Sequence, residues 1–189
     1  MKKNLTKAES LQFLSKYQKF LNIKIPNFFF IEKNNFKLKE NIILNKIKNK
    51  FKKKKIIIIS SSLQEDKEYQ SNAGKFKSFG NIDYNDKNKI KEKINEILDE
   101  FDNSKDQILI QEYIDKPKVS GVIFTRDIKN NSPYLTINYD LSRRTDLITS
   151  GKANPSMKIL VFFRDFEKYK KNKANLTLLK TIKKIEKIF

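Results

Sequence analysis

The chain has 189 residues, of which 38% are hydrophobic, and a formal net charge of +19; this length suits one large domain or two small lobes. It contains neither cysteine nor histidine, which excludes disulfides, thiolate chemistry, histidine bases and histidine metal ligands within the chain. No apolar run approaches the ~20 residues that span a bilayer, and the N-terminal lysines precede no apolar region. We therefore expect a cytoplasmic protein that does not associate with membranes.

The positive charge alone favours a nucleic-acid partner, but the kind of basic residue argues against one. Specific phosphate and base recognition favours arginine, and the chain has only four. These are Arg126, Arg143, Arg144 and Arg164. An excess of Lys, Ile, Asn and Phe is also typical of an AT-rich genome. We therefore interpret the lysine runs at 46–55 and 168–173 as solvated surfaces and do not expect nucleic acid to bind.

The N-terminal part predicts a helix, a strand and a second helix. Residues 6–21 carry leucines at helical spacing, and Thr6 has a glutamate three positions on, as in a capping box. Lys7 lies in the first turn, where the helix dipole disfavours a cation. It is either a tolerated surface lysine or one that faces an anionic ligand. A strand is predicted at 26–32 and a lysine-rich amphipathic helix at 38–54.

The stretch 55–82 carries the most information about function. Four isoleucines at 56–59 are typical of a strand buried on both faces. Serines follow at 60–62, and then a loop rich in hydroxyls with a glycine, in which backbone N–H groups and hydroxyls can converge on phosphate oxygens. An ordinary surface loop is the alternative, since the Walker A spacing is absent. A short strand at 76–82 is predicted to fold back over the loop.

The next three elements are predicted as a helix and two strands. Residues 86–101 have an apolar face at helical spacing, with Asp86 as the N-cap. Strands are expected at 107–113 and 118–127. Because the link between these strands is short, we expect them to pair antiparallel.

The C-terminal part is predicted to contain strands and a last helix. Residues 133–140 alternate as in a half-exposed strand, 146–150 are considered as a further strand, and 157–163 have the pattern of a buried strand. The helix predicted at 174–189 ends while its apolar stripe is still running, which indicates a chain cut short of its partner elements. Helices interleaved with strands, followed by antiparallel strands, predict an α+β fold, with two lobes and a cleft between them.

Three motifs then support a resemblance to a known family. The first lies in ISSSLQEDKEYQSNAGKFKS at 59–78; its matching residues are Ser60, Ser61, Glu65, Asp66, Ser71, Ala73, Gly74 and Ser78. VSGVIFTRD at 119–127 is similar to a second signature, and ILIQEYI at 108–114 to a hinge strand. Lys7-Ala8 with Leu11 is similar to the start of the domain. Together they resemble the N-terminal nucleotide-binding domain of pyruvate phosphate dikinase and phosphoenolpyruvate synthase.

The resemblance implies an ATP-grasp fold, ATP as the ligand, and one incomplete domain over 1–189. The N-terminal lobe would cover about 1–105 and a partial second lobe 106–189. The resemblance also assigns nucleotide-binding roles to eight residues. They are Lys7, Ser60, Ser61, Gly74, Ser78, Gln111, Glu112 and Arg126.

The implied roles differ along the nucleotide. Lys7 would contact the phosphates as a point charge, and Gly74 and Ser78 would belong to a flap over them. Gln111 and Glu112 would lie beside the adenine. Arg126 would lie near the cleft, and a structural alternative is that it pairs with an acidic residue such as Asp127 or Glu65.

Two departures from the family pattern bear on activity. Ile59 stands where the family has an arginine that is expected to bind phosphate, and isoleucine has no donor. The family also completes its site with Asp-x-Glu and Gln-x-Arg-Pro segments that hold Mg²⁺ and the γ-phosphate, and neither follows here. Because phosphoryl transfer depends on positioning and charge neutralisation, we assign no catalytic or metal-binding residue.

Three functions remain open from the sequence. The first is an incomplete ATP-binding domain of this kinase-type phosphotransferase family, inactive or weakly active alone. The second is an active phosphotransferase subunit completed by a partner chain, which would dock on the apolar stripe of the last helix. The third is a basic nucleic-acid-binding protein.

Overall fold

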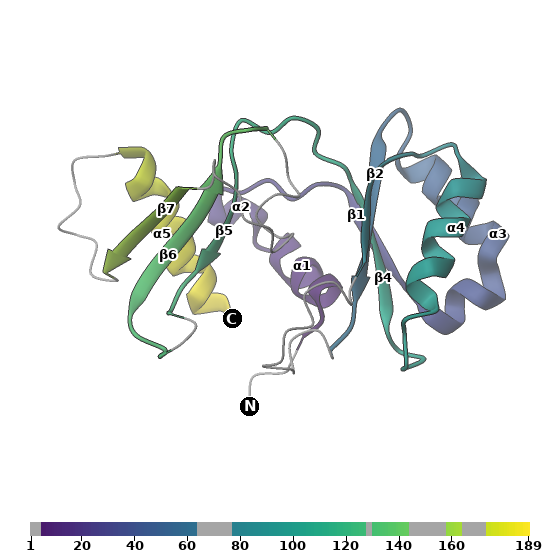
Figure 1. Cartoon of the computed structure of the whole chain (residues 1–189), viewed down its shortest axis with the longest axis horizontal. Helices are drawn as coiled ribbons and strands as arrows, with labels where there is room; N and C mark the ends of the chain where they lie inside the picture. Colours follow the sequence, from purple (N-terminus) through teal and green to yellow (C-terminus); the bar gives the residue numbers. More distant parts are fainter. Residues whose placement is uncertain (1–4, 64–76, 128–129, 144–157, 164–172) are drawn as a thin grey trace. The chain divides into compact units, whose positions relative to one another are not determined.

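The computed structural model describes residues 5–63, 77–127, 130–143, 158–163 and 173–189 (Figure 1). The predicted α+β class is confirmed, because helices combine with two antiparallel sheets. The chain divides into two compact units: Met1–Gln18 with Lys24–Ile114, and Lys19–Ile23 with Asp115–Phe189. The main boundary thus falls after Ile114, whereas the sequence suggested a lobe boundary near 105.

The secondary-structure elements follow the predicted order. They are α1 (Lys7–Ser15), α2 (Gln18–Leu21), β1 (Phe28–Glu32), α3 (Lys33–Lys50), β2 (Lys55–Ser61), β3 (Ser78–Asp83), α4 (Lys87–Leu98), β4 (Gln107–Glu112), β5 (Ser120–Phe124), β6 (Tyr134–Asp140), β7 (Lys158–Phe163) and α5 (Lys173–Ile188). The possible strand at 146–150 lies outside the described residues. No helix in the described part of the chain is long and apolar enough to cross a membrane.

The sheet of the first unit has the strand order β1-β4-β2-β3, with every neighbouring pair antiparallel. Helices α3 and α4 cover one face, and α1 lies against the other (Figure 1). The main core lies between the sheet and α3 and α4, because these elements supply its fully buried side chains. Those include Phe36, Ile47, Phe51, Ile56, Ile58, Ile82, Ile90, Ile94, Ile97, Ile108 and Ile110.

Strand β2 is fully buried on one face only, so the expectation of burial on both faces is wrong. Ile56 and Ile58 are inaccessible to solvent and belong to the main core, whereas Ile57 and Ile59 are half-buried. Successive side chains of a strand point to opposite faces, and here α3 and α4 cover only one of them. Two of the four isoleucines therefore pack in the main core, and the other two lie on the opposite face of the sheet, which is only partly covered.

The predicted first helix is two helices. At the break the Lys16 and Tyr17 N–H groups donate to the carbonyl oxygens of Phe13 and Leu14, three residues back, at 3.2 and 2.9 Å. The Gln18 Nε2 then donates to the Ser15 carbonyl oxygen at 3.2 Å, so a side chain takes the acceptor at the end of α1. The second predicted helix is also different, because α3 begins at Lys33 directly after β1 and has a kink at Lys39.

In the second unit, β5, β6 and β7 form an antiparallel sheet on which α5 packs (Figure 1). The predicted pairing of the strands at 107–113 and 118–127 is wrong. Strand β4 is flanked by β1 and β2, so both its edges are occupied, and β5 pairs with β6 instead. The alternation predicted for 133–140 is confirmed by the burial pattern of β6.

Two expectations about exposure are wrong in this unit. Leu179 and Ile182 of α5 are buried in a cluster with Leu135 and Ile137, so the stripe that was to dock a partner chain covers the sheet of its own unit. Strand β7, predicted to be buried, pairs only with β6 among the described strands. Ile159 and Val161 of β7 are each 57% exposed, whereas Leu160 between them packs against the core of this unit.

Candidate functional site

The start of α1 is fixed to the end of β2 by a small polar cluster. Thr6 caps the helix: its Oγ1 accepts from the Glu9 N–H at 3.2 Å, and Glu9 Oε2 accepts from the Thr6 N–H at 3.0 Å. Thr6 Oγ1 also donates to Gln107 Oε1 at 2.7 Å, and the Ala8 N–H donates to Ser61 Oγ at 2.9 Å. Ser61 and Gln107 lie directly opposite each other on β2 and β4. A single cross-strand pair therefore binds both Thr6 and Ala8 at the start of α1.

The sequence indicated the capping box but missed the role of Gln107. Thr6, Ser61 and Gln107 are all buried, and a buried polar group without a partner costs stability. A glutamine at the first position of a strand was the available signal. Its partner is 101 residues away in sequence, so the pairing could not be read locally.

Lys7 and Ser61 are brought together by this arrangement, because Lys7 directly precedes the residue whose N–H binds Ser61. The Lys7 side chain is exposed at the first turn of α1. Ser60, although adjacent to Ser61, lies on the opposite face. It pairs with Ile108, a core residue, and its N–H donates to the Lys77 carbonyl oxygen at 3.2 Å.

Ser78 lies at the same end of β2, on the face of Ser61. It pairs with Ile59 and is exposed. The Nζ of the adjacent Lys77 forms an ion pair of 2.7 Å with Glu100, which lies just after the end of α4. The hydrogen bond to Glu100 raises the pKa of Lys77 above its ordinary value of 10.5, so Lys77 keeps its charge and is held by Glu100.

Gln111 and Glu112 lie at the other end of β4. Gln111 pairs with Ile57 and Phe28, and its face is that of Ser61, whereas Glu112 forms an ion pair of 2.8 Å with Lys54. Gln111 is four residues along β4 from Gln107, roughly 13 Å at ~3.3 Å per residue. On this face the half-buried Ile57 lies opposite Gln111, and the half-buried Ile59 lies opposite Ser78.

These pairings define one surface of the first unit, which we call the second face of the sheet. It carries Ser61 and Ser78 at one end, Gln111 at the other, and isoleucines between. Ile59, where the resemblance expects arginine, lies directly opposite Ser78 on this face. The position of the missing cation thus adjoins the hydroxyls that were predicted to accompany it.

Four predicted residues are not assigned to this surface. Ser60 and Glu112 lie on the opposite face, because they pair with the core residues Ile108 and Ile56. Gly74 lies outside the described residues. Arg126 belongs to the second unit, is exposed, and its Nη1 donates to the Asn131 carbonyl oxygen at 3.2 Å. The same turn is closed by the Asp127 N–H and the Ser132 carbonyl oxygen at 3.0 Å. Arg126 therefore stabilises its own turn. A structural role was the alternative predicted for it, but its partner is a backbone carbonyl oxygen and not an acidic side chain.

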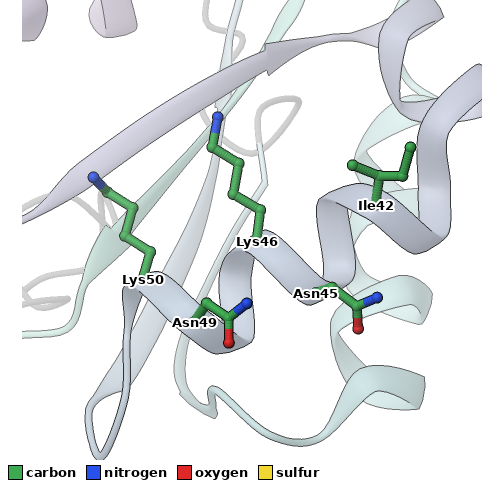
Figure 2. A pocket seen from close by; sticks show the side chains of 5 residues that line it. All are labelled: Ile42, Asn45, Lys46, Asn49 and Lys50. Carbon is green, nitrogen blue, oxygen red and sulfur yellow. The ribbon is translucent and has the colours of Figure 1, made fainter.

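The described residues include no group of three or more acidic, histidine or cysteine side chains that could hold a metal ion. An open depression of about 650 Å³ lies elsewhere, along α3 (Figure 2). Its lining consists of Ile42, Asn45, Lys46, Asn49 and Lys50. No model of a known protein family matches the sequence, and no curated protein matches it.

Proposed function

We propose that the second face of the first unit binds the phosphates of ATP beside Lys7, Ser61 and Ser78, with the adenine toward Gln111. The chain would then contain a nucleotide-binding domain similar to those of pyruvate phosphate dikinase and phosphoenolpyruvate synthase. The observation that supports the proposal is the strand register, in which Ser61, Ser78 and Gln111 share one face. The exposed Ser78 hydroxyl and the Lys7 ammonium can bind phosphate oxygens, whereas the buried Ser61 holds the start of α1 beside them through the Ala8 N–H. The half-buried isoleucines suit an apolar base.

The same geometry implies weak binding and little or no phosphoryl transfer. Ile59 occupies the position opposite Ser78 without offering a donor, and no metal-holding group is present among the described residues. A hydrogen bond to a charged group contributes about 1.5–3 kcal/mol, so the absent arginine would cost roughly 10- to 150-fold in Kd. Mg²⁺ would have to come with the nucleotide.

Calorimetric titration with Mg-ATP tests the proposal. We expect weak binding by the natural chain and at least ~10-fold tighter binding by Ile59→Arg. Ile57→Arg is the matched control, because Ile57 is equally half-buried on the same face but lies opposite Gln111. Equal gains in both variants would show that added charge alone is responsible. Absence of binding by both the natural chain and Ile59→Arg would refute the proposal.

Substitution of an exposed residue gives an independent test, because it leaves the packing of the core unchanged. Lys7→Gln is expected to weaken ATP binding several-fold, since it removes a charge beside the phosphates. Lys16→Gln changes an equally exposed lysine at the other end of α1 and should leave the affinity unchanged. Rapid ATP turnover by the isolated natural chain would contradict the inactive state proposed here.

A further inference from the structure

The C-terminal half of α3 and the turn after it form the most strongly basic surface of the first unit. Seven of the ten residues from 46 to 55 are lysine, and the sequence has no acidic residue between Glu40 and Glu65. All seven lysines are exposed. The segment thus differs from α4, where Lys91 pairs with Glu40, and Lys93 pairs with Glu92 and Glu96.

Most of these lysines are not used inside the fold. Lys54 pairs with Glu112, and Lys46 Nζ lies 5.0 Å from the centre of the Phe29 ring. Within the described parts of the chain, no ion pair involves Lys48, Lys50, Lys52 or Lys53. A lysine near a helix C-terminus stabilises the helix by about 0.3–1 kcal/mol through its interaction with the helix dipole. That effect fades within the last turn, so it leaves most of the seven unexplained.

The outer surface between the lysines is polar and slightly hollowed. Lys46 and Lys50 lie one turn apart and rise from the same side of α3, whereas the side chains of Asn45 and Asn49 extend away from that side (Figure 2). Amide and ammonium groups there are donors toward an anion. Asn45 is held in place, because its Oδ1 accepts from Lys87 Nζ at 2.8 Å.

We propose that this surface binds the phosphate backbone of nucleic acid without sequence preference. This goes beyond the proposed ATP site, because α3 covers the opposite face of the sheet. Lysines act as point charges toward phosphates and release condensed counterions, which requires no arginine forks. The low arginine content therefore argues against base reading but not against this mode of binding.

An anionic membrane is the competing partner, and the burial of α3 disfavours it. Binding of a helix in the membrane interface needs a free apolar face. The apolar row of α3, which includes Ile43, Ile47 and the capping Phe51, is buried in the core. The exposed apolar residues Leu38 and Ile42 precede the lysine-rich half and are too few to anchor it.

The test is fluorescence anisotropy of a labelled 20-base-pair duplex as a function of salt. We expect log K to fall linearly with log salt for the natural chain. The double variant Lys46→Gln/Lys50→Gln should reduce the slope by about 2, since each phosphate contact contributes about 0.9. Lys50→Glu, a single exposed change that leaves Lys46 and its Phe29 contact intact, should weaken binding further than Lys50→Gln.

The matched control removes the same charge elsewhere in the first unit. Lys16 and Lys105 are exposed, and the loop of Lys105 adjoins the opposite end of α3, where the Lys33 N–H donates to the Asp106 carbonyl oxygen. Lys16→Gln/Lys105→Gln should leave the slope nearly unchanged. If both double variants reduced the salt slope equally, binding would depend on total charge and not on this surface, and the proposal would be overturned. Absence of duplex binding, or preferential binding to phosphatidylserine vesicles, would also overturn it.

Discussion

At the scale of single residues, two positions show how backbone geometry constrains residue type. Gly121 lies in β5 opposite Tyr139 of β6, and a Cβ added there would lie 2.8 Å from the Asn138 carbonyl oxygen. Lys53, in the turn after α3, has a φ of 61°, in the left-handed region that glycine adopts most easily. The first residue suits its site, while the second is tolerated at a cost.

Gly121→Ala should destabilise the second unit by ~1–3 kcal/mol, because a backbone oxygen cannot move aside for the new methyl group. Gly80→Ala is the control. Its Cβ would meet Tyr113 Cε2 at 2.9 Å, but a side chain can turn away, so a loss below ~1 kcal/mol is expected. Hydrogen exchange of the strands in each unit measures both effects. A larger loss for Gly80→Ala would contradict this explanation.

Lys53→Gly should stabilise the first unit by about 1 kcal/mol, because it removes the Cβ that disfavours a positive φ. Lys52→Gly removes the same charge at a neighbouring residue without a positive φ and should instead destabilise slightly. Urea denaturation followed by hydrogen exchange in α3 separates the two results. If both variants changed stability in the same direction, the charge and not the backbone would be responsible.

At the scale of elements, α1 shows how a short helix is attached by polar groups. It has nine residues, and Ala8 is its only buried residue, so apolar contact alone holds it weakly. The hydrogen bonds of Thr6 and Ala8 to Gln107 and Ser61 fix its first turn on the sheet. Any ligand bound beside Lys7 depends on this attachment.

Thr6→Ala should therefore destabilise α1 by ~1–3 kcal/mol, since it removes the helix cap and leaves the buried Gln107 amide oxygen without its partner. Thr6→Ser retains Oγ and should cost less than ~1 kcal/mol. Hydrogen exchange in α1 reports the change, and ATP titration of the same variants reports its effect on the proposed site. Equal losses for alanine and serine would show that the methyl group matters and the hydroxyl does not.

At the scale of the whole molecule, the chain has two cores made by different means. The first unit packs α3 and α4 on a four-stranded sheet. The second packs α5 on a three-stranded sheet, with Leu135, Ile137, Leu179 and Ile182 at its centre. Separate cores allow each unit to lose stability by itself.

Ile47→Ala and Leu179→Ala test this separation. Both side chains are almost completely buried, at 0% and 1% exposure, so each truncation should cost ~2–5 kcal/mol. We expect Ile47→Ala to increase hydrogen exchange only in the first unit and Leu179→Ala only in the second. Leu178→Ala, 39% exposed, is the control and should cost less than ~1 kcal/mol. Equal effects of one substitution on both units would indicate a single cooperative core.

The sequence by itself determined the fold class, the order of the elements and the Thr6 and Asp86 caps, because periodicity and capping act over a few residues. The residues of the candidate site came from the resemblance to the pyruvate phosphate dikinase domain, and of these Ser61, Ser78 and Gln111 share one face. The sequence did not reveal that α1 and α2 are separate, because the apolar spacing continues through the break, where Gln18 Nε2 binds the Ser15 carbonyl oxygen.

Only the tertiary structure decided which strands meet and which side chains share a face. Strand β4 lies between β1 and β2, so Gln111 lies on the face of Ser61 and Ser78 but at the other end of it, while Ser60 turns to the core. The physical reason is that strand register and helix packing arise from contacts between distant segments. The local pattern of a strand is the same whichever neighbour it pairs with.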